Sequence, residues 1–366
     1  MARAQSNVIP VQQPEVSYEV DPVRVEGEIM DWFEKLTGFR EAGYDETRAR
    51  LAVEDVRLVS RINGASYGVG ELELVSLQAL RARVKSAVNP PSRMQTSVVT
   101  GDVRHMHRSA ENAGALFQVA SQFNLLEMVS PDITPEHGVT RYQSDPTQGP
   151  ACAIAAGAAT IYRNYFAPVG GSEGQTAREQ LDGLTDLGEA LSRATKLSVG
   201  ELWTMQNGYA LGTRTGLDAI AQHLGTLAKD QLDVLRGKLR IGIHHDVEVT
   251  EAAGPDRPRV SQAFCSALPV AYSRIPPAHW TPFAVLVLEA AYEATMWAAV
   301  LNAQRGGSKV VFLTLLGGGA FGNHCNWIHA AMRRALKLVT AYDLDVRLVS
   351  YGTPSREIVA MAEEFN

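Results

Sequence analysis

Cysteine is scarce in this 366-residue sequence, which contains only Cys152, Cys265 and Cys325. An odd and sparse set argues against a disulfide framework and is typical of a reducing compartment, so we expect a cytoplasmic protein. The spacing of Cys325 from His324 and His329 is not that of a zinc site. We therefore expect neither a metal nor a cofactor.

An excess of basic residues is also missing. There are 34 Lys and Arg against 40 Asp and Glu, which gives a net charge of −6. This balance disfavours nucleic acid or an anionic membrane as the principal partner. A small anionic ligand stays possible, because backbone N–H groups bind phosphate without any Lys or Arg.

The sequence has no long apolar run free of charge. Its first 20 residues lack the apolar segment of a signal peptide. The most apolar window, residues 281–301, contains Glu289 and Glu293, which favours a buried helix over a membrane span. We expect no membrane contact.

Apolar periodicity predicts strands that alternate with helices, and therefore an α/β protein. Residues 1–95 are expected to form a loose arm (1–25) and a mainly helical extension, although 71–77 alternates like a strand. Residues 96–366 are expected to form the α/β domain, with a helical insertion at about 172–237. The predicted strands are 97–103, 115–124, 238–250, 259–272, 311–316 and 346–351, and the main predicted helices are 151–166, 281–303 and 324–339.

The stretch "VFLTLLGGGAFGN" (311–323) ends an apolar strand in a run of glycines. From Gly317 onward the spacing matches the dinucleotide fingerprint G-x-G-x-x-G. A Rossmann fold also needs an acid at the end of the next strand, but Asp343 and Asp345 precede that strand. Another phosphate loop, or a glycine bend without a ligand, are the other interpretations.

A second stretch of small residues, "DPTQGPACAIAAG" (145–157), leads into a predicted helix. Gly149 and Ala151–Ala153 would leave the backbone at the helix N-terminus nearly bare, which suits a diphosphate. Tight packing of the helix on the sheet would explain the same residues. Two such loops could bind one diphosphate from both sides.

Taken together, these stretches resemble the macrodomain, an ADP-ribose-binding fold, over about residues 97–352. The resemblance implies a three-layer α/β/α fold with a mixed sheet. "VVTGDV" is similar to the strand whose aspartate binds adenine, and "ALFQVASQFN" to the strand whose last asparagine contacts the distal ribose. Phe321 would line that ribose. The first phosphate loop departs from the family, because only Gly149 remains of its glycines and Pro150 lacks an N–H.

On this resemblance the ligand contacts fall in four segments of the chain. They are Asp102, Val103, Gln122, Asn124, Gln148, Gly149, Ala151, Cys152, Ala153, Gly317, Gly318, Gly319, Ala320, Phe321, Gly322 and Asn323.

Longer stretches such as "DPTQGPACAIAAGAATIYRNYF", "LWTMQNGYAL" and "IGIHHDVEVT" resemble a bacterial-effector subgroup of macrodomains. That subgroup implies an arginine-specific ADP-ribosylhydrolase, with ADP-ribosylated protein, including ubiquitin, as the partner. Two alternatives are an ADP-ribose reader without turnover and an NAD(P)-dependent oxidoreductase that uses the glycine loop.

Hydrolysis at the distal ribose requires a carboxylate, and residues 311–323 contain none. Asp145 is one candidate, although it could simply start an Asp-Pro turn. Asp246 and Glu248 are a second, since strand alternation puts both on one face, where they could also be solvated. Glu127 is the third, with a salt bridge in a loop as its alternative. The segment "NGYAL" at 207–211 could form a lid or merely interrupt a helix.

Overall fold

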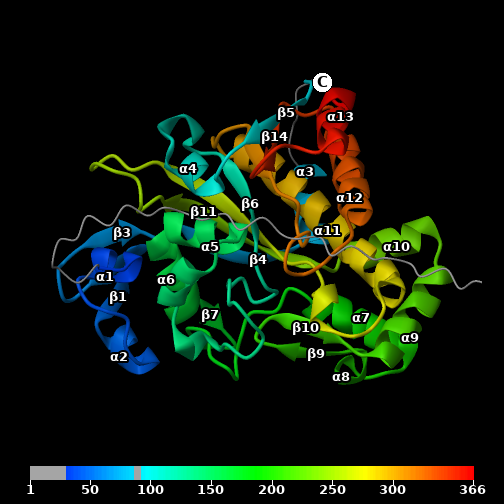
Figure 1. Ribbon diagram of the computed structural model, residues 1–366, viewed down its shortest axis with the longest axis horizontal. Coiled ribbons are helices and arrows are strands. Elements are labelled where there is room, and N and C mark those ends of the chain that lie inside the picture. The colour runs from blue at the N-terminus through cyan, green and yellow to red at the C-terminus, as the bar shows by residue number, and fades with distance from the viewer. Residues whose placement is uncertain (1–29, 86–91) are drawn as a thin grey trace, which may run out of the picture. The chain divides into compact units, whose positions relative to one another are not determined.

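The computed structural model describes residues 30–85 and 92–366, and Asp31–Asn366 form one compact unit. The arm expected at residues 1–25 lies outside the described residues. The centre of the unit is a seven-stranded mixed sheet in the order β4-β11-β12-β6-β13-β14-β5 (Figure 1). Its strands are β4 (Glu71–Ser76), β5 (Gln95–Thr100), β6 (Leu116–Ala120), β11 (Arg240–Glu248), β12 (Arg259–Cys265), β13 (Val310–Leu313) and β14 (Asp345–Ser350).

Five neighbouring strands, from β12 to β5, run parallel, and β11 runs antiparallel to both of its neighbours. Strands in the middle of a covered parallel sheet are buried on both faces. All four residues of β13 are buried, which explains the continuous apolar run before the glycines.

Helices cover both faces of this sheet (Figure 1). The helices α4 (Val103–Arg108), α5 (Gln148–Ala155) and α6 (Gly157–Tyr165) pack on one face. The helices α3 (Leu77–Lys85), α11 (Pro277–Gln304), α12 (Cys325–Leu338) and α13 (Arg356–Glu364) pack on the other. The predicted three-layer α/β/α fold is confirmed, but the helix predicted at 151–166 is divided at Ala156.

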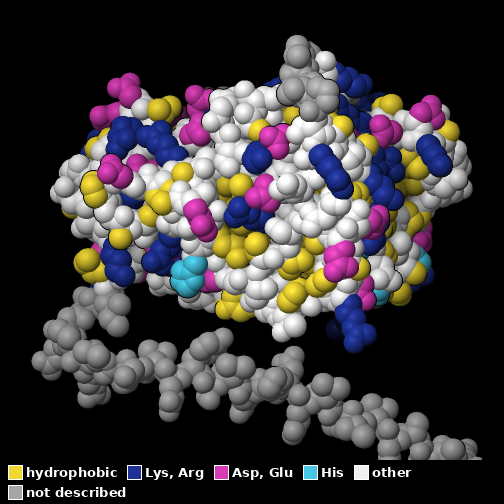
Figure 2. Space-filling model, turned by 90° about the horizontal axis from the view of Figure 1, so that it is seen from above, with side chains coloured by type: hydrophobic (Ala, Val, Ile, Leu, Met, Phe, Trp, Pro, Cys, Tyr) yellow, Lys and Arg dark blue, Asp and Glu magenta, His cyan; other side chains and the backbone are white. Residues whose placement is uncertain are grey.

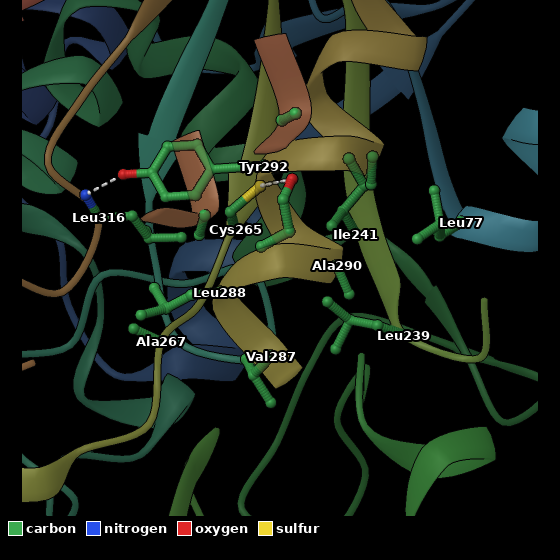
Figure 3. Close-up of a cluster of buried hydrophobic side chains, with 14 of the residues drawn as sticks. Leu77, Leu239, Ile241, Cys265, Ala267, Val287, Leu288, Ala290, Tyr292 and Leu316 are labelled. Atoms are coloured by element: carbon green, nitrogen blue, oxygen red, sulfur yellow. Dashed lines mark hydrogen bonds between the residues drawn. The ribbon is translucent and has the colours of Figure 1, made fainter. Parts of the chain in front are cut away.

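Helix α11 is the central element of the second layer. By length and composition it could cross a membrane, but 78% of its apolar window is buried inside the protein. Figure 3 shows its side chains, among them Val287, Leu288 and Ala290, in the same cluster as Ile241 of β11. Burial against the sheet therefore accounts for its apolar composition.

The N-terminal region differs from the prediction of a mainly helical extension. After α1 (Trp32–Thr37) and α2 (Tyr44–Ala49), the chain forms an antiparallel sheet of β1 (Leu51–Glu54), β2 (Arg57–Ser60) and β3 (Ser66–Gly68). The turn between β1 and β2 is made by Asp55 and Val56, with φ of 45° and 55°. Because β4 belongs to the central sheet, the expected boundary at 95/96 falls within the compact unit.

The insertion is helical but also contains two hairpins. The segment "NGYALGT" belongs to a hairpin whose turn residues, Asn207 and Gly208, both have positive φ, as a tight two-residue turn requires. From the strand just before the insertion to its end, the elements are β7 (Pro168–Val169), β8 (Ser172–Glu173), α7 (Thr185–Thr195), α8 (Val199–Leu202), β9 (Trp203–Gln206), β10 (Tyr209–Gly212), α9 (Arg214–Gly225) and α10 (Lys229–Arg236). Short 3-10 helices elsewhere are η1 (Ala110–Asn112), η2 (Pro135–His137), η3 (Thr140–Ser144) and η4 (Val270–Tyr272).

Candidate functional site

A cavity of about 570 Å³ lies where four parallel strands end. Asp102 follows β5, Ser121 follows β6, Thr314 follows β13 and Tyr351 follows β14, and all four residues line it. The carboxyl ends of parallel strands meet at one edge of a sheet, where α/β proteins bind their ligands. The volume is that of a site for a nucleotide-sized molecule.

One wall of the cavity is loop 2, which we define as residues 314–323. The backbone N–H groups of Gly318, Gly322 and Asn323 donate to carbonyl oxygens within the loop. Among the described residues, no acceptor contacts the N–H groups of the three consecutive residues 319–321, which all line the cavity. Successive N–H groups of this kind form a site for an anion.

The opposite wall is loop 1, residues 145–151, which leads into α5. Within the described part of the chain, no acceptor contacts the N–H of Gln148 or Gly149 at the start of this helix. Pro150 has no N–H, and the N–H of Ala151 donates to the carbonyl oxygen of Thr147. The positive end of the helix dipole and two free donors therefore face the cavity.

The side chain of Gln148 is hydrogen-bonded to the backbone of β6. Its Oε1 accepts from the N–H of Ala120 at 2.8 Å, and its Nε2 donates to the carbonyl oxygen of Gln118 at 2.9 Å. Gly149 permits this close approach, because an added Cβ would lie 2.1 Å from the carbonyl oxygen of Ala120. Packing on β6, the alternative considered for loop 1, thus accounts for the glycine at 149 and for the contacts of the Gln148 side chain.

At one end of the cavity Asp102 caps α4, with Oδ1 accepting from the N–H of Arg104 at 2.8 Å. Val103, Leu315 and Tyr351 line the same cavity, and the Tyr351 side chain is 78% exposed. Arg104 forms an ion pair with Glu251. This end combines one available carboxylate with apolar surface.

The other end carries three aromatic rings in mutual contact. The ring centroids of Tyr209 and Tyr272 are 5.3 Å apart, and that of Phe321 lies 5.4 Å and 5.6 Å from them. Tyr209 belongs to β10, so the insertion contributes this side chain to the cavity lining. Gln122, also at the cavity, donates to the Tyr209 hydroxyl and accepts from the N–H of Met128.

Glu127 lines the cavity from a fully buried position. Nη2 of Arg163 in α6 lies 3.1 Å and 3.4 Å from its two carboxylate oxygens, so the predicted alternative of a loop salt bridge is present. Burial raises the pKa of Glu127 to about 7, and the neighbouring Arg163 partly offsets that rise. The hydroxyl of Tyr142 accepts from its backbone N–H at 3.1 Å.

Asp145 also lines the cavity and is half-buried. Its Oδ1 accepts from the N–H of Thr147 at 2.8 Å, which is the Asp-Pro turn that the sequence allowed. No donor among the described residues contacts Oδ2. Asp145 therefore differs from Glu127 in having a carboxylate oxygen that a water can reach.

The pair Asp246 and Glu248, the second candidate for the catalytic carboxylate, lies away from the cavity lining. A β-bulge between His244 and Val247 gives Asp246 a φ of 53° and breaks the strand alternation. Asp246 pairs with Arg305, whereas Glu248 accepts from the N–H of Gly68 and pairs with Arg257. The expectation that both carboxylates share one strand face is wrong, and each has its own structural partner.

Several predicted ligand residues shape the site without lining the cavity. Asn124 is buried and uses its side chain on Gln180 and on the N–H of Leu126. Cys152 and Ala153 are buried in the core, and burial raises the pKa of the Cys152 thiol well above its ordinary value, so it is not a reactive thiolate.

In loop 2, three of the predicted residues lie behind the lining. Gly318 packs against Ile328, because a Cβ added at Gly318 would lie 3.2 Å from Cδ1 of Ile328. Gly322 has a φ of 69° and Asn323 donates from Nδ2 to the carbonyl oxygen of Leu268, so both close the loop. Asp102, Val103, Gln122, Gly149, Ala151, Gly317, Gly319, Ala320 and Phe321 do line the cavity, as does Gln148.

Sequence reasoning missed four aromatic and apolar residues of the lining, three of which come from outside the two loops. Tyr209 was indicated only by the lid interpretation of "NGYAL", and Tyr272, Leu315 and Tyr351 had no local pattern to mark them. All four line the cavity.

The described residues contain no group of three or more His, Cys, Asp or Glu that could hold a metal ion. On the face drawn in Figure 2, Lys and Arg are interspersed with Asp and Glu.

No family model and no curated protein matches the sequence. Similar solved structures include a poly(ADP-ribose) glycohydrolase from Thermomonospora curvata (12% identity, TM-score 0.42, covering 86% of this chain and 95% of that one). Another is the Deinococcus radiodurans poly(ADP-ribose) glycohydrolase in complex with ADP-ribose (12% identity, TM-score 0.40, covering 80% of this chain and 92% of that one). At these values the likeness assigns neither an activity nor a residue role to this chain.

Proposed function

We propose that this chain binds ADP-ribose in the cavity and hydrolyses the bond that joins it to a protein side chain. The observation that carries the proposal is the pair of facing donor sets: the free N–H groups of residues 319–321 and those at the start of α5. A diphosphate accepts hydrogen bonds on both sides, so one diphosphate between the two loops would accept from both donor sets.

The two ends of the cavity suit the two ends of ADP-ribose. Asp102 offers an acceptor for an adenine amino group beside the apolar surfaces of Leu315 and Tyr351. The distal ribose then lies at the end that holds Phe321, Gln122 and Asp145. This orientation is the one implied by the macrodomain resemblance of the sequence.

Asp145 is our candidate for the carboxylate that acts on water. Hydrolysis requires a water to attack the anomeric carbon while the bond to the leaving group breaks, and positive charge develops on the ribose. The carboxylate oxygen without a protein partner can orient that water and accept its proton. Both oxygens of Glu127 face Arg163, so we assign Glu127 to holding the site together.

We further propose that the leaving group is an arginine side chain, with ADP-ribosylated ubiquitin among the candidate substrates. The aromatic rings of Tyr209 and Tyr272, together with the charge of Asp145, which acts on Tyr209, would attract a guanidinium. Among the described residues that line the cavity, the cationic side chain is Arg104, which is paired with Glu251 at the opposite end. The arginine linkage itself rests on the sequence resemblance.

Release of ADP-ribose from arginine-linked and glutamate-linked ADP-ribosylated proteins tests this function. Asp145→Asn should lower kcat roughly 10²- to 10⁴-fold, because it removes the base but keeps the shape of the side chain. Asp246→Asn is the matched control and should retain wild-type turnover, since Asp246 pairs with Arg305 away from the cavity lining.

Three outcomes would contradict parts of the proposal. Full turnover by Asp145→Asn would remove Asp145 from the mechanism. Tight binding of ADP-ribose without release from either linkage would make the chain a reader. No binding of ADP-ribose in calorimetry at high micromolar concentration would dismiss the whole function.

A further inference from the structure

Beneath loop 2, a buried tyrosine contacts the backbone on both sides of Leu315. The hydroxyl of Tyr292 in α11 donates to the carbonyl oxygen of Thr314 at 2.6 Å. It also accepts from the N–H of Leu316 at 2.9 Å (Figure 3). The Tyr292 side chain is fully buried and does not line the cavity. Burial raises its pKa, so the hydroxyl keeps the proton that it donates.

A second buried side chain joins the two loops through β6. The Oε1 atom of Gln118 accepts from the N–H of Thr314 at 3.2 Å, and its Nε2 donates to the Thr295 hydroxyl at 3.0 Å. The backbone carbonyl of the same residue accepts from Nε2 of Gln148 in loop 1. Gln118 thus contacts loop 2 with its side chain and loop 1 with its main chain.

These contacts occur where the chain leaves the sheet. Strand β13 ends at Leu313, so the backbone groups of Thr314 and Leu316 have lost their strand partners. The N–H of Leu316 donates to the carbonyl oxygen of Thr314 at 3.0 Å, and side chains from α11 and β6 add the remaining contacts to these groups. Together they set the direction in which residues 317–321 depart. That direction decides where the free N–H groups of residues 319–321 point, and donors that are already oriented bind without a reorganisation cost.

We propose that Tyr292 and Gln118 are positioning residues that hold the two loops at the separation a diphosphate requires. They act through the loop backbone and do not touch the ligand. The inference rests on the proposed binding of ADP-ribose, but its structural part concerns the order of loop 2 and can be measured without a ligand.

The test compares three variants of the full chain: Tyr292→Phe, Gln118→Met and, as a matched control, Tyr165→Phe. Tyr165 in α6 is another fully buried tyrosine, and its hydroxyl donates to the carboxylate of Glu41 at 2.8 Å. Removal of this hydroxyl should lower the stability of the fold by a similar amount without affecting loop 2. We expect Tyr292→Phe to weaken ADP-ribose binding about tenfold and to leave adenosine binding unchanged. Hydrogen exchange at residues 315–321 should quicken in the same variant, with or without ligand.

Several results would overturn the inference. One is wild-type affinity and wild-type exchange in both Tyr292→Phe and Gln118→Met. Another is an equal loss of ADP-ribose affinity in Tyr165→Phe, because the weaker binding would then follow from the lower stability of the whole fold. If the wild type does not bind ADP-ribose, the proposed function fails, and the exchange rates at residues 315–321 alone decide the positioning role.

Discussion

Loop 1 and loop 2 face the same cavity, but their glycines are required for different reasons. An added Cβ at Gly149 would lie 2.1 Å from the carbonyl oxygen of Ala120, so loop 1 needs glycine for packing on β6. At Gly319 an added Cβ would meet no atom within 4 Å, so nothing in the fold of loop 2 requires glycine there. A glycine that the fold does not need, beside free N–H groups, is the stronger sign of a ligand.

The largest effect should come from Gly149→Ala. Its methyl group must displace either β6 or α5, and overpacking of this kind costs on the order of 3 kcal/mol of unfolding free energy. Urea denaturation measures the loss. Gly225→Ala is the matched control, because its Cβ would meet open space at the end of α9, and its stability should stay within about 1 kcal/mol of wild type. Equal stability of the two variants would contradict the packing role of Gly149.

Gly319→Ala should reverse that pattern. The fold has room for the methyl group, so the melting temperature should stay within a few degrees of wild type. The methyl group would stand between the free N–H groups and a diphosphate, so the affinity for ADP-ribose should fall about tenfold. Calorimetry with ADP-ribose and with adenosine checks this, since adenosine binding should not change. Unchanged ADP-ribose affinity would remove the diphosphate from loop 2.

The contrast between these loops shows what the sequence could predict. An apolar run that ends in glycines identified β13 and loop 2, because a buried parallel strand and a tight exit both leave local signals. The same reasoning could not distinguish Gly318 from Gly319. One faces Ile328 and the other open space, and that difference depends on where α12 packs.

Other errors have a similar physical origin. Ala52, Val56 and Val59 fit a helical spacing, yet they belong to a hairpin whose turn has no glycine to mark it. Asp246 and Glu248 were assigned to one face because a β-bulge cannot be read from alternation. The rings of Tyr209 and Tyr272 meet Phe321 across segments far apart in the sequence, so no local pattern could bring them together.

The smallest effect should be a pH dependence that arises from Glu127, which packs against Gly149 of loop 1. Loop 2 contains no ionisable side chain, whereas an added Cβ at Gly149 would lie 3.1 Å from Cγ of Glu127. Burial raises the pKa of Glu127 to about 7, so below this pH the side chain is mostly a neutral acid and above it mostly an anion. The diphosphate of ADP-ribose keeps its charge throughout this range.

Ionisation of Glu127 adds a negative charge near a bound diphosphate, and Arg163 offsets it only in part. The affinity for ADP-ribose should therefore fall about threefold as the pH rises from about 6 to 8. Cys152 and Tyr142 nearby have their pKa values raised well above this range by burial and do not titrate in it. Glu127→Gln should make the affinity nearly independent of pH, as calorimetry at several pH values would show. If the affinity of Glu127→Gln still fell with rising pH, another group would be responsible, and Glu127 would have no electrostatic effect on the ligand.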